Sequence, residues 1–311
     1  MISGNYKKNG YLISEKILNE NQISSLRDDL DKEFEKHTDV MKYLHNFENK
    51  ELIKKILSLY SHSTLKNIKN DLTKISKSKI SILPHFNVMK NYHVDLRQFH
   101  GWHRDCSGEL KYDYCNKIIG SEKYLFSKVA FYLQENSEYG GSIDIIKTSH
   151  KNFSKFKVIL RKIKNIPLRI IFFLHKNFRK LYNLFPESLF MFLINAKRLY
   201  PTKGTAVLFD SRIIHRGSPI SKKKLSEISF TKGDYQASTP ENETKYSIYC
   251  HIGTADALDS YFFDRLKRPD CSNELKIWLD QINFISKFDT KLSEEMYSLI
   301  KPIRQKYSEH A

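Results

Sequence analysis

The sequence predicts a mainly β fold, an antiparallel sandwich or barrel, with helices added at both ends. Three observations support this. From about residue 82 onward, short runs rich in β-branched and aromatic residues alternate with turn signals. Before residue 80 and toward the C-terminus, apolar residues recur at helical spacing. A hydrophobic content of 40% and an aromatic content of 13% are typical of a chain that folds around a core.

The N-terminal region, about residues 1–80, is expected to be mostly helical. A short strand near residue 11 precedes a helix that Asn19 or Asn21 caps. Apolar residues on this helix recur every three or four positions, at Ile23, Leu26, Leu30 and Phe34. Residues 40–80, rich in Lys, Leu and Ile, indicate further helices.

The β core is expected over about residues 82–255, followed by a helical tail over about 256–311, all within one domain of residues 1–311. Gly140-Gly141 indicates a turn between two of its strands. The expected strands are SKVAFYLQ (127–134), GSIDIIKTS (141–149), GTAVLFDSRII (204–214), SEISFTKGDY (226–235) and KYSIYCHIG (245–253).

A basic amphipathic segment, residues 152–199, interrupts this core. Pro167 and Pro186 divide it into about three helical pieces. The chain carries a formal net charge of +17. Residues 151–200 hold much of it, because Glu187 is their one acidic residue among many Lys and Arg. Positive charge concentrated in one segment predicts a basic patch on one side of the folded protein.

Three interpretations of this segment remain open. The first is a lid over a site, with an apolar inner face and solvated lysines. The second is a pair of helices that lies on an anionic membrane surface. Phe172, Phe173, Phe178 and Phe185 beside basic residues have the form of interfacial anchors. Contact with nucleic acid is the least favoured, because long apolar faces are not needed to bind phosphates.

A cytoplasmic location, with peripheral contact to a membrane, is expected. The sequence has no apolar run of about 18 residues and no secretory signal at its start. Its four cysteines form no C-x-x-C pair and no zinc-finger spacing, which favours free thiols in a reducing compartment.

The tripeptide His103-Arg104-Asp105 is a candidate metal motif. On a strand, residues two apart point to the same side, so His103 and Asp105 can face one metal ion. A second histidine from a distant strand would complete a two-histidine, one-carboxylate triad and leave three coordination positions open. The tripeptide alone is weak evidence, because His93-Val94-Asp95 repeats the pattern.

The context of His103 resembles the phytanoyl-CoA dioxygenase family. The resemblance covers roughly residues 9–37 and 92–235, with the basic segment as an insertion. It rests on an ordered set of motifs: WHRD (102–105), a strand ending in Leu133-Gln134, the Gly140-Gly141 turn, Thr148-Ser149-His150 and G-x-x-x-L-F-D-x-x-x-x-H-R-G (204–217).

This resemblance implies a double-stranded β-helix, a jelly-roll of the cupin-like kind, flanked by helices. It implies a bound Fe(II), with 2-oxoglutarate and O2 as co-substrates. His103, Asp105 and His215 match the metal ligands of the family. An aspartate in place of a small residue favours hydroxylation over halogenation.

The co-substrate site departs from the family pattern. Members carry an arginine about eleven residues beyond the distal histidine, whereas this chain has Ser226 there. Lys224, with Ser226, is the expected replacement, and Arg97 is the reserve candidate. Lysine cannot form the two-pronged contact of arginine, and the alternative is that these lysines are only solvated.

The resemblance therefore predicts an Fe(II)- and 2-oxoglutarate-dependent enzyme that hydroxylates a small molecule. An amphiphilic or lipid-linked compound is one candidate class of substrate. The alternative is a non-catalytic metal- or lipid-binding jelly-roll protein that has lost the use of 2-oxoglutarate.

Overall fold

A large antiparallel sheet forms the centre of the computed structural model. The model describes residues 2–36, 41–43, 49–91, 93–95, 101–105, 125–151, 166, 170, 187–228, 236–257, 259 and 274–307. The strands of the large sheet, in spatial order, are β1 (Tyr11–Ile13), β8 (Ala206–Asp210), β5 (Phe126–Tyr132), β11 (Lys245–Gly253), β3 (Ser81–Asn91) and β2 (Met41–Tyr43).

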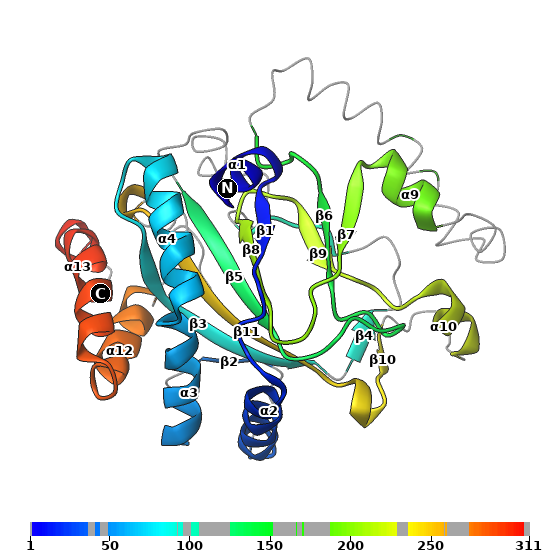
Figure 1. Cartoon of the computed structure of the whole chain (residues 1–311), viewed down its shortest axis with the longest axis horizontal. Helices are drawn as coiled ribbons and strands as arrows, with labels where there is room; N and C mark the ends of the chain where they lie inside the picture. The colour runs from blue at the N-terminus through cyan, green and yellow to red at the C-terminus, as the bar shows by residue number, and fades with distance from the viewer. Residues whose placement is uncertain are drawn as a thin grey trace.

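A smaller sheet lies beside the large one (Figure 1). Its strands, in spatial order, are β7 (Ala196–Leu199), β6 (Ile143–Ile146) and β9 (His215–Gly217). His103 extends this sheet by an isolated antiparallel bridge to His215. A further pair consists of β4 (His93–Asp95) and β10 (Gln236–Ser238).

The connectivity of these strands is that of a jelly-roll. The chain alternates between sheets: β3, β5, β8 and β11 belong to the large sheet. The segment around His103, then β6 and β7, and then β9 belong to the small sheet between them. Two sheets exchanging strands in this order make a double-stranded β-helix. The predicted mainly β fold with a jelly-roll core and flanking helices is confirmed.

Helices cover the outer face of the large sheet (Figure 1). They are α1 (Ile2–Asn9), α2 (Glu20–Phe34), α3 (Lys50–Tyr60), α4 (Ser63–Ser76), α12 (Glu274–Ser286) and α13 (Thr290–Lys306). Asn19 caps α2 by accepting a hydrogen bond from the Gln22 N–H at 2.9 Å, and the Gln22 side chain accepts one from the Asn19 N–H. The remaining helical segments are α9 (Glu187–Leu193), α10 (Lys222–Glu227) and the 3-10 turn η2 (Glu241–Glu243).

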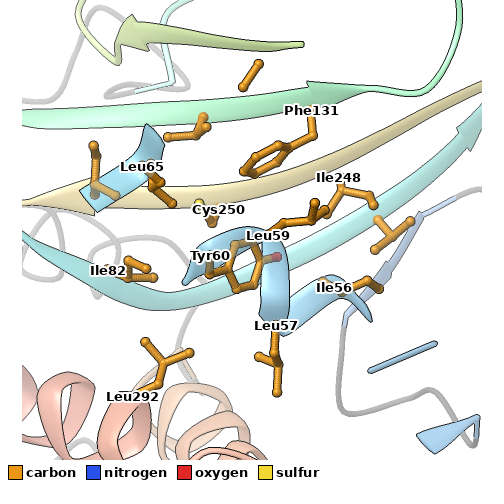
Figure 2. Packing of buried hydrophobic residues seen from close by; sticks show 14 of the residues in the cluster. Ile56, Leu57, Leu59, Tyr60, Leu65, Ile82, Phe131, Ile248, Cys250 and Leu292 are labelled. Carbon is orange, nitrogen blue, oxygen red and sulfur yellow. The ribbon is translucent and has the colours of Figure 1, made fainter. Parts of the chain in front are cut away.

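Strict alternation along the central strands separates two cores. In β5, Val129 and Phe131 contact the helical layer, whereas Ala130 and Tyr132 point between the two sheets. Figure 2 shows Phe131 and Tyr60 of α3 within the same buried cluster, and their ring centres lie 6.2 Å apart. The inner core is smaller, and the polar residues on the same inward faces line the cavity described below.

Two expectations require correction. The run 226–235 was expected to be a strand, but Ser226 and Glu227 close helix α10, which Ser221 begins by capping the Lys224 N–H. Residues 229–235 lie outside the described part of the chain. Within the basic segment, residues 196–199 form strand β7 because they pair with β6. Apart from Ile166 and Ile170, residues 152–186 are not described.

In the described ranges, no helix has both the length and the apolar character needed to cross a bilayer.

Gly140 ends the turn that was predicted from the sequence, at φ +82°. A Cβ on Gly140 would collide with the carbonyl oxygen of Ser218, next to the small sheet. We therefore expect Gly140→Ala to lower the free energy of unfolding by about 1–2 kcal/mol or more, from the left-handed backbone and the clash together. Chemical denaturation measures this change.

Gly217→Ala is the matched control, because an added Cβ there would meet nothing within 4 Å. It should change the free energy of unfolding by less than about 0.5 kcal/mol. Equal effects of the two substitutions would contradict the structure of this turn.

Candidate metal centre

Two segments far apart in the sequence bring three metal-ligand side chains together. The His103 N–H donates to the His215 carbonyl at 2.9 Å, and the His215 N–H donates to the His103 carbonyl at 2.9 Å. This reciprocal pair locks the register of the two segments. The two imidazole rings lie 4.4 Å apart, and Asp105 is two residues from His103.

The donor atoms of this triad face one another. Asp105 Oδ1 lies 3.6 Å from His103 Nε2 and 3.6 Å from His215 Nε2. All three ligand atoms are within 4.8 Å of one another. Metal–ligand bonds of about 2.0–2.2 Å require donors roughly 3 Å apart, so small side-chain movements suffice. Two histidines and one carboxylate are the facial set that leaves coordination positions open.

Hydrogen bonds fix the protonation of both imidazoles. His103 Nδ1 lies 2.6 Å from the Gly101 carbonyl, and His215 Nδ1 lies 3.1 Å from the Ile213 carbonyl. A carbonyl oxygen accepts only, so each Nδ1 carries the proton and each Nε2 presents its lone pair toward Asp105. This is the second-shell arrangement of metal-binding histidines.

The electrostatics of the triad also favour a cation. Burial acts to raise the pKa of Asp105, but the opposing effects, of which the positive charge of Lys128 is the largest, outweigh it, so its pKa is lowered. Lys128 Nζ lies 3.4 Å from Asp105 Oδ2. Burial lowers the pKa of His215 to about 4. At neutral pH an ionised carboxylate therefore faces the lone pair of neutral His215, and a divalent metal ion satisfies both.

A buried network of charged side chains around Asp144 holds the two segments that carry the metal ligands. Asp144 is fully buried and accepts hydrogen bonds from Arg198 at 2.7 Å, Arg216 at 2.9 Å and Ser218 at 3.0 Å. The Arg216 guanidinium lies 4.6 Å from the centre of the Trp102 ring. Since Trp102 and Arg216 adjoin His103 and His215, the network fixes both ligand segments. Sequence reasoning missed it; the signal was one acidic residue in the apolar run IDII.

A cavity of about 450 Å³ opens beside the two histidines, both of which line it. Its walls come from the inward faces of β3, β5 and β11 and from the small sheet. Three cationic residues are among those that line it: Lys128, Arg216 and Lys245. Sequence reasoning had singled out none of these three, because only the pairing of strands shows which residues of a strand face the cavity.

Two of the expected co-substrate residues, Lys224 and Ser226, do not line this cavity. Both lie on α10. Lys224 Nζ pairs with Glu227 at 2.6 Å, and the Ser226 hydroxyl donates to the Lys223 carbonyl at 2.6 Å. Arg97 lies outside the described residues, as do the side chains of β4, including His93.

The fold and the donor set together define a jelly-roll protein with a candidate site for one divalent metal ion. No protein-family model matches the chain, and no curated protein matches it.

Solved structures give distant similarities. The non-heme alpha-ketoglutarate-dependent epimerase SnoN from nogalamycin biosynthesis is 11% identical, with 82% of each chain covered and a TM-score of 0.45. EctD from S. alaskensis, with 2-oxoglutarate and 5-hydroxyectoine, is 9% identical over 82% of this chain and 76% of that chain, at a TM-score of 0.45.

HygX from Streptomyces hygroscopicus, with nickel and 2-oxoglutarate bound, is 11% identical over 81% of this chain and 85% of that chain, at a TM-score of 0.44. Similarities this low carry no argument about the activity of the chain. Membership of the phytanoyl-CoA dioxygenase family stays a prediction.

The metal site predicts distinct effects of three histidine substitutions. His103→Ala and His215→Ala each remove one of three donors, so we expect the affinity for Co(II) to fall more than about 100-fold. Equilibrium dialysis or the visible spectrum of bound Co(II) measures this. His93→Ala, the control from the second His-x-Asp motif, should bind Co(II) as the unmodified protein does. Loss of Co(II) binding in His93→Ala alone would contradict the assignment.

Proposed function

We propose that the chain is an Fe(II)- and 2-oxoglutarate-dependent oxygenase that hydroxylates a small molecule. One observation carries the proposal: two imidazole nitrogens and one carboxylate converge on a single point beside a cavity in a jelly-roll core. Such a donor set leaves positions open for a co-substrate and O2. The ordered motifs around His103 and His215 support the same assignment.

Fe(II), when bound with 2-oxoglutarate, supplies the oxidation of a C–H bond by O2, with release of succinate and CO2. The residues of the chain keep the metal ligands in the orientation and protonation state that metal binding requires. His103 and His215 present Nε2 because backbone carbonyls hold their Nδ1 protons. Lys128 keeps Asp105 ionised. Because an aspartate holds the third ligand position, hydroxylation is favoured over halogenation.

The alternative is a non-catalytic jelly-roll that binds a metal or a lipid without 2-oxoglutarate. It is favoured by the position of Lys224 and Ser226, which lie outside the cavity. The two functions differ in one cheap observation. A weak visible band on adding 2-oxoglutarate to the Fe(II) protein without oxygen supports the enzyme, whereas metal binding with no such band supports the alternative.

Turnover provides the direct test of the enzyme. We expect succinate release that requires Fe(II), 2-oxoglutarate and O2, even without a substrate, at a slow uncoupled rate. His103→Ala should abolish it, because the loss of one ligand removes the metal, while Lys224→Ala should retain it because Lys224 lies outside the cavity. Succinate is measured by chromatography. Equal succinate release by His103→Ala would contradict the proposal.

An amphiphilic substrate reached from an anionic membrane surface is the substrate class that we propose. Exposed large apolar side chains gather in the described part of the basic segment and just after it: Ile166, Ile170, Leu189, Phe192 and Tyr200. The Phe192 side chain is 79% exposed. Apolar side chains amid basic residues suit the interface of an anionic bilayer, to which each basic residue adds about 1 kcal/mol. A cytoplasmic protein with peripheral membrane contact fits this proposal.

Vesicle binding tests the membrane contact. The protein should co-sediment with phosphatidylglycerol vesicles at low salt, but not with phosphatidylcholine vesicles. Phe192→Ser should weaken this binding several-fold because it removes an exposed apolar anchor. Tyr297→Ser, at a side chain that is 39% exposed on α13, is the control and should not. If the protein ignores anionic vesicles, the membrane contact is wrong.

A further inference from the structure

Lys245 stands apart from the other cations of the cavity. The Arg216 guanidinium is held by Asp144 at 3.0 and 2.9 Å, and Lys128 is paired with Asp105. Lys245, the first residue of β11, is 8% exposed and donates to the backbone carbonyl of Tyr139. Within the described residues it has no carboxylate at ion-pair distance.

A buried lysine without an acidic partner is costly. Burial lowers the pKa of Lys245 to about 8, against a smaller opposing effect of Glu243. The ammonium group is still mainly charged at neutral pH. Its surroundings therefore lack one negative charge that a ligand in the cavity can provide.

Two hydrogen-bond donors in the same cavity have no partner among the described residues. They are Gln134 Nε2 and Ser142 Oγ, both buried atoms. The Tyr246 N–H donates to Gln134 Oε1 at 2.7 Å, which fixes the amide so that its NH2 group is the unpaired side.

These donors lie around Lys245. Gln134 contacts the backbone of Tyr246, the next residue along β11. Ser142 follows Gly141, where an added Cβ would lie 3.1 Å from Lys245 Cε. An ammonium, an amide and a hydroxyl that line one cavity form a set of donors suited to a carboxylate, which accepts about four hydrogen bonds.

The inward face of β11 links this group to the metal ligands. Lys245, Ser247 and Tyr249 alternate along the strand and all line the cavity. The Lys128 ammonium lies 4.6 Å from the centre of the Tyr249 ring and 3.4 Å from Asp105. The same cavity therefore reaches from the candidate metal ligands to Lys245.

We propose that Lys245, with Gln134 and Ser142, binds the carboxylate that 2-oxoglutarate carries at the end away from its keto acid. The inference rests on the proposed function and deepens it, because it assigns the co-substrate to the wall formed by β11 in place of Lys224 on α10.

Calorimetric titration of the Mn(II)-loaded protein without O2 tests this assignment. Two ligands are compared: 2-oxoglutarate, and 2-oxobutyrate, which has the same keto acid without the far carboxylate. Lys245→Met should weaken 2-oxoglutarate binding about 10- to 100-fold, as expected for the loss of a charged hydrogen bond. It should leave Mn(II) and 2-oxobutyrate binding unchanged. Lys245→Arg should restore most of the 2-oxoglutarate affinity.

Lys224→Met is the matched control and should bind 2-oxoglutarate as the unmodified protein does. Gln134→Leu provides a second test, with a smaller expected loss of about 5- to 10-fold for one neutral donor. Unchanged 2-oxoglutarate affinity in Lys245→Met, or loss of it in Lys224→Met, would overturn the inference while leaving the proposed function intact. If the unmodified protein binds Mn(II) but no 2-oxoglutarate, the proposed function itself fails.

Discussion

The two hydrogen bonds between the backbones of His103 and His215 are the constraint on which the candidate site depends. They join a short segment after β4 to strand β9, about a hundred residues later in the chain. Side-chain direction follows from this register, since residues two apart share a face. A shift by one residue would turn Asp105 and His215 away from each other. Asp144, opposite Arg216 in the small sheet, opposes such a shift because it binds the Arg216 side chain next to His215.

The jelly-roll has two interiors, and they differ in polarity. The outer core, between the large sheet and the helices, is closely packed and apolar, as Figure 2 shows around Tyr60 and Phe131. The inner space between the sheets is apolar only in part. It holds Lys128 and Lys245, whose burial is unfavourable unless each charge has a partner. Stability therefore comes from the outer core, which allows the inner one to hold charges for binding a metal and an anion.

Local patterns in the sequence predicted much of this arrangement. Short β-branched and aromatic runs between turn signals placed β5, β6, β8 and β11, and the capping residue Asn19 was one of the two expected. The His103 and Asp105 pair followed from a period of two. What failed depends on pairing between distant segments. Strand β7, predicted as part of a helical segment, forms because its residues pair with β6. The partners of Asp144 and the inward position of Lys245 are visible only once the sheets are assembled.

The most direct test of the central claim is a crystal structure of the protein grown with Mn(II) and 2-oxoglutarate in the absence of O2. The account predicts one anomalous scattering peak, bound by His103 Nε2, His215 Nε2 and a carboxylate oxygen of Asp105, with the keto acid of 2-oxoglutarate completing the coordination. A peak bound by other residues, or a triad without metal at saturating Mn(II), would contradict it.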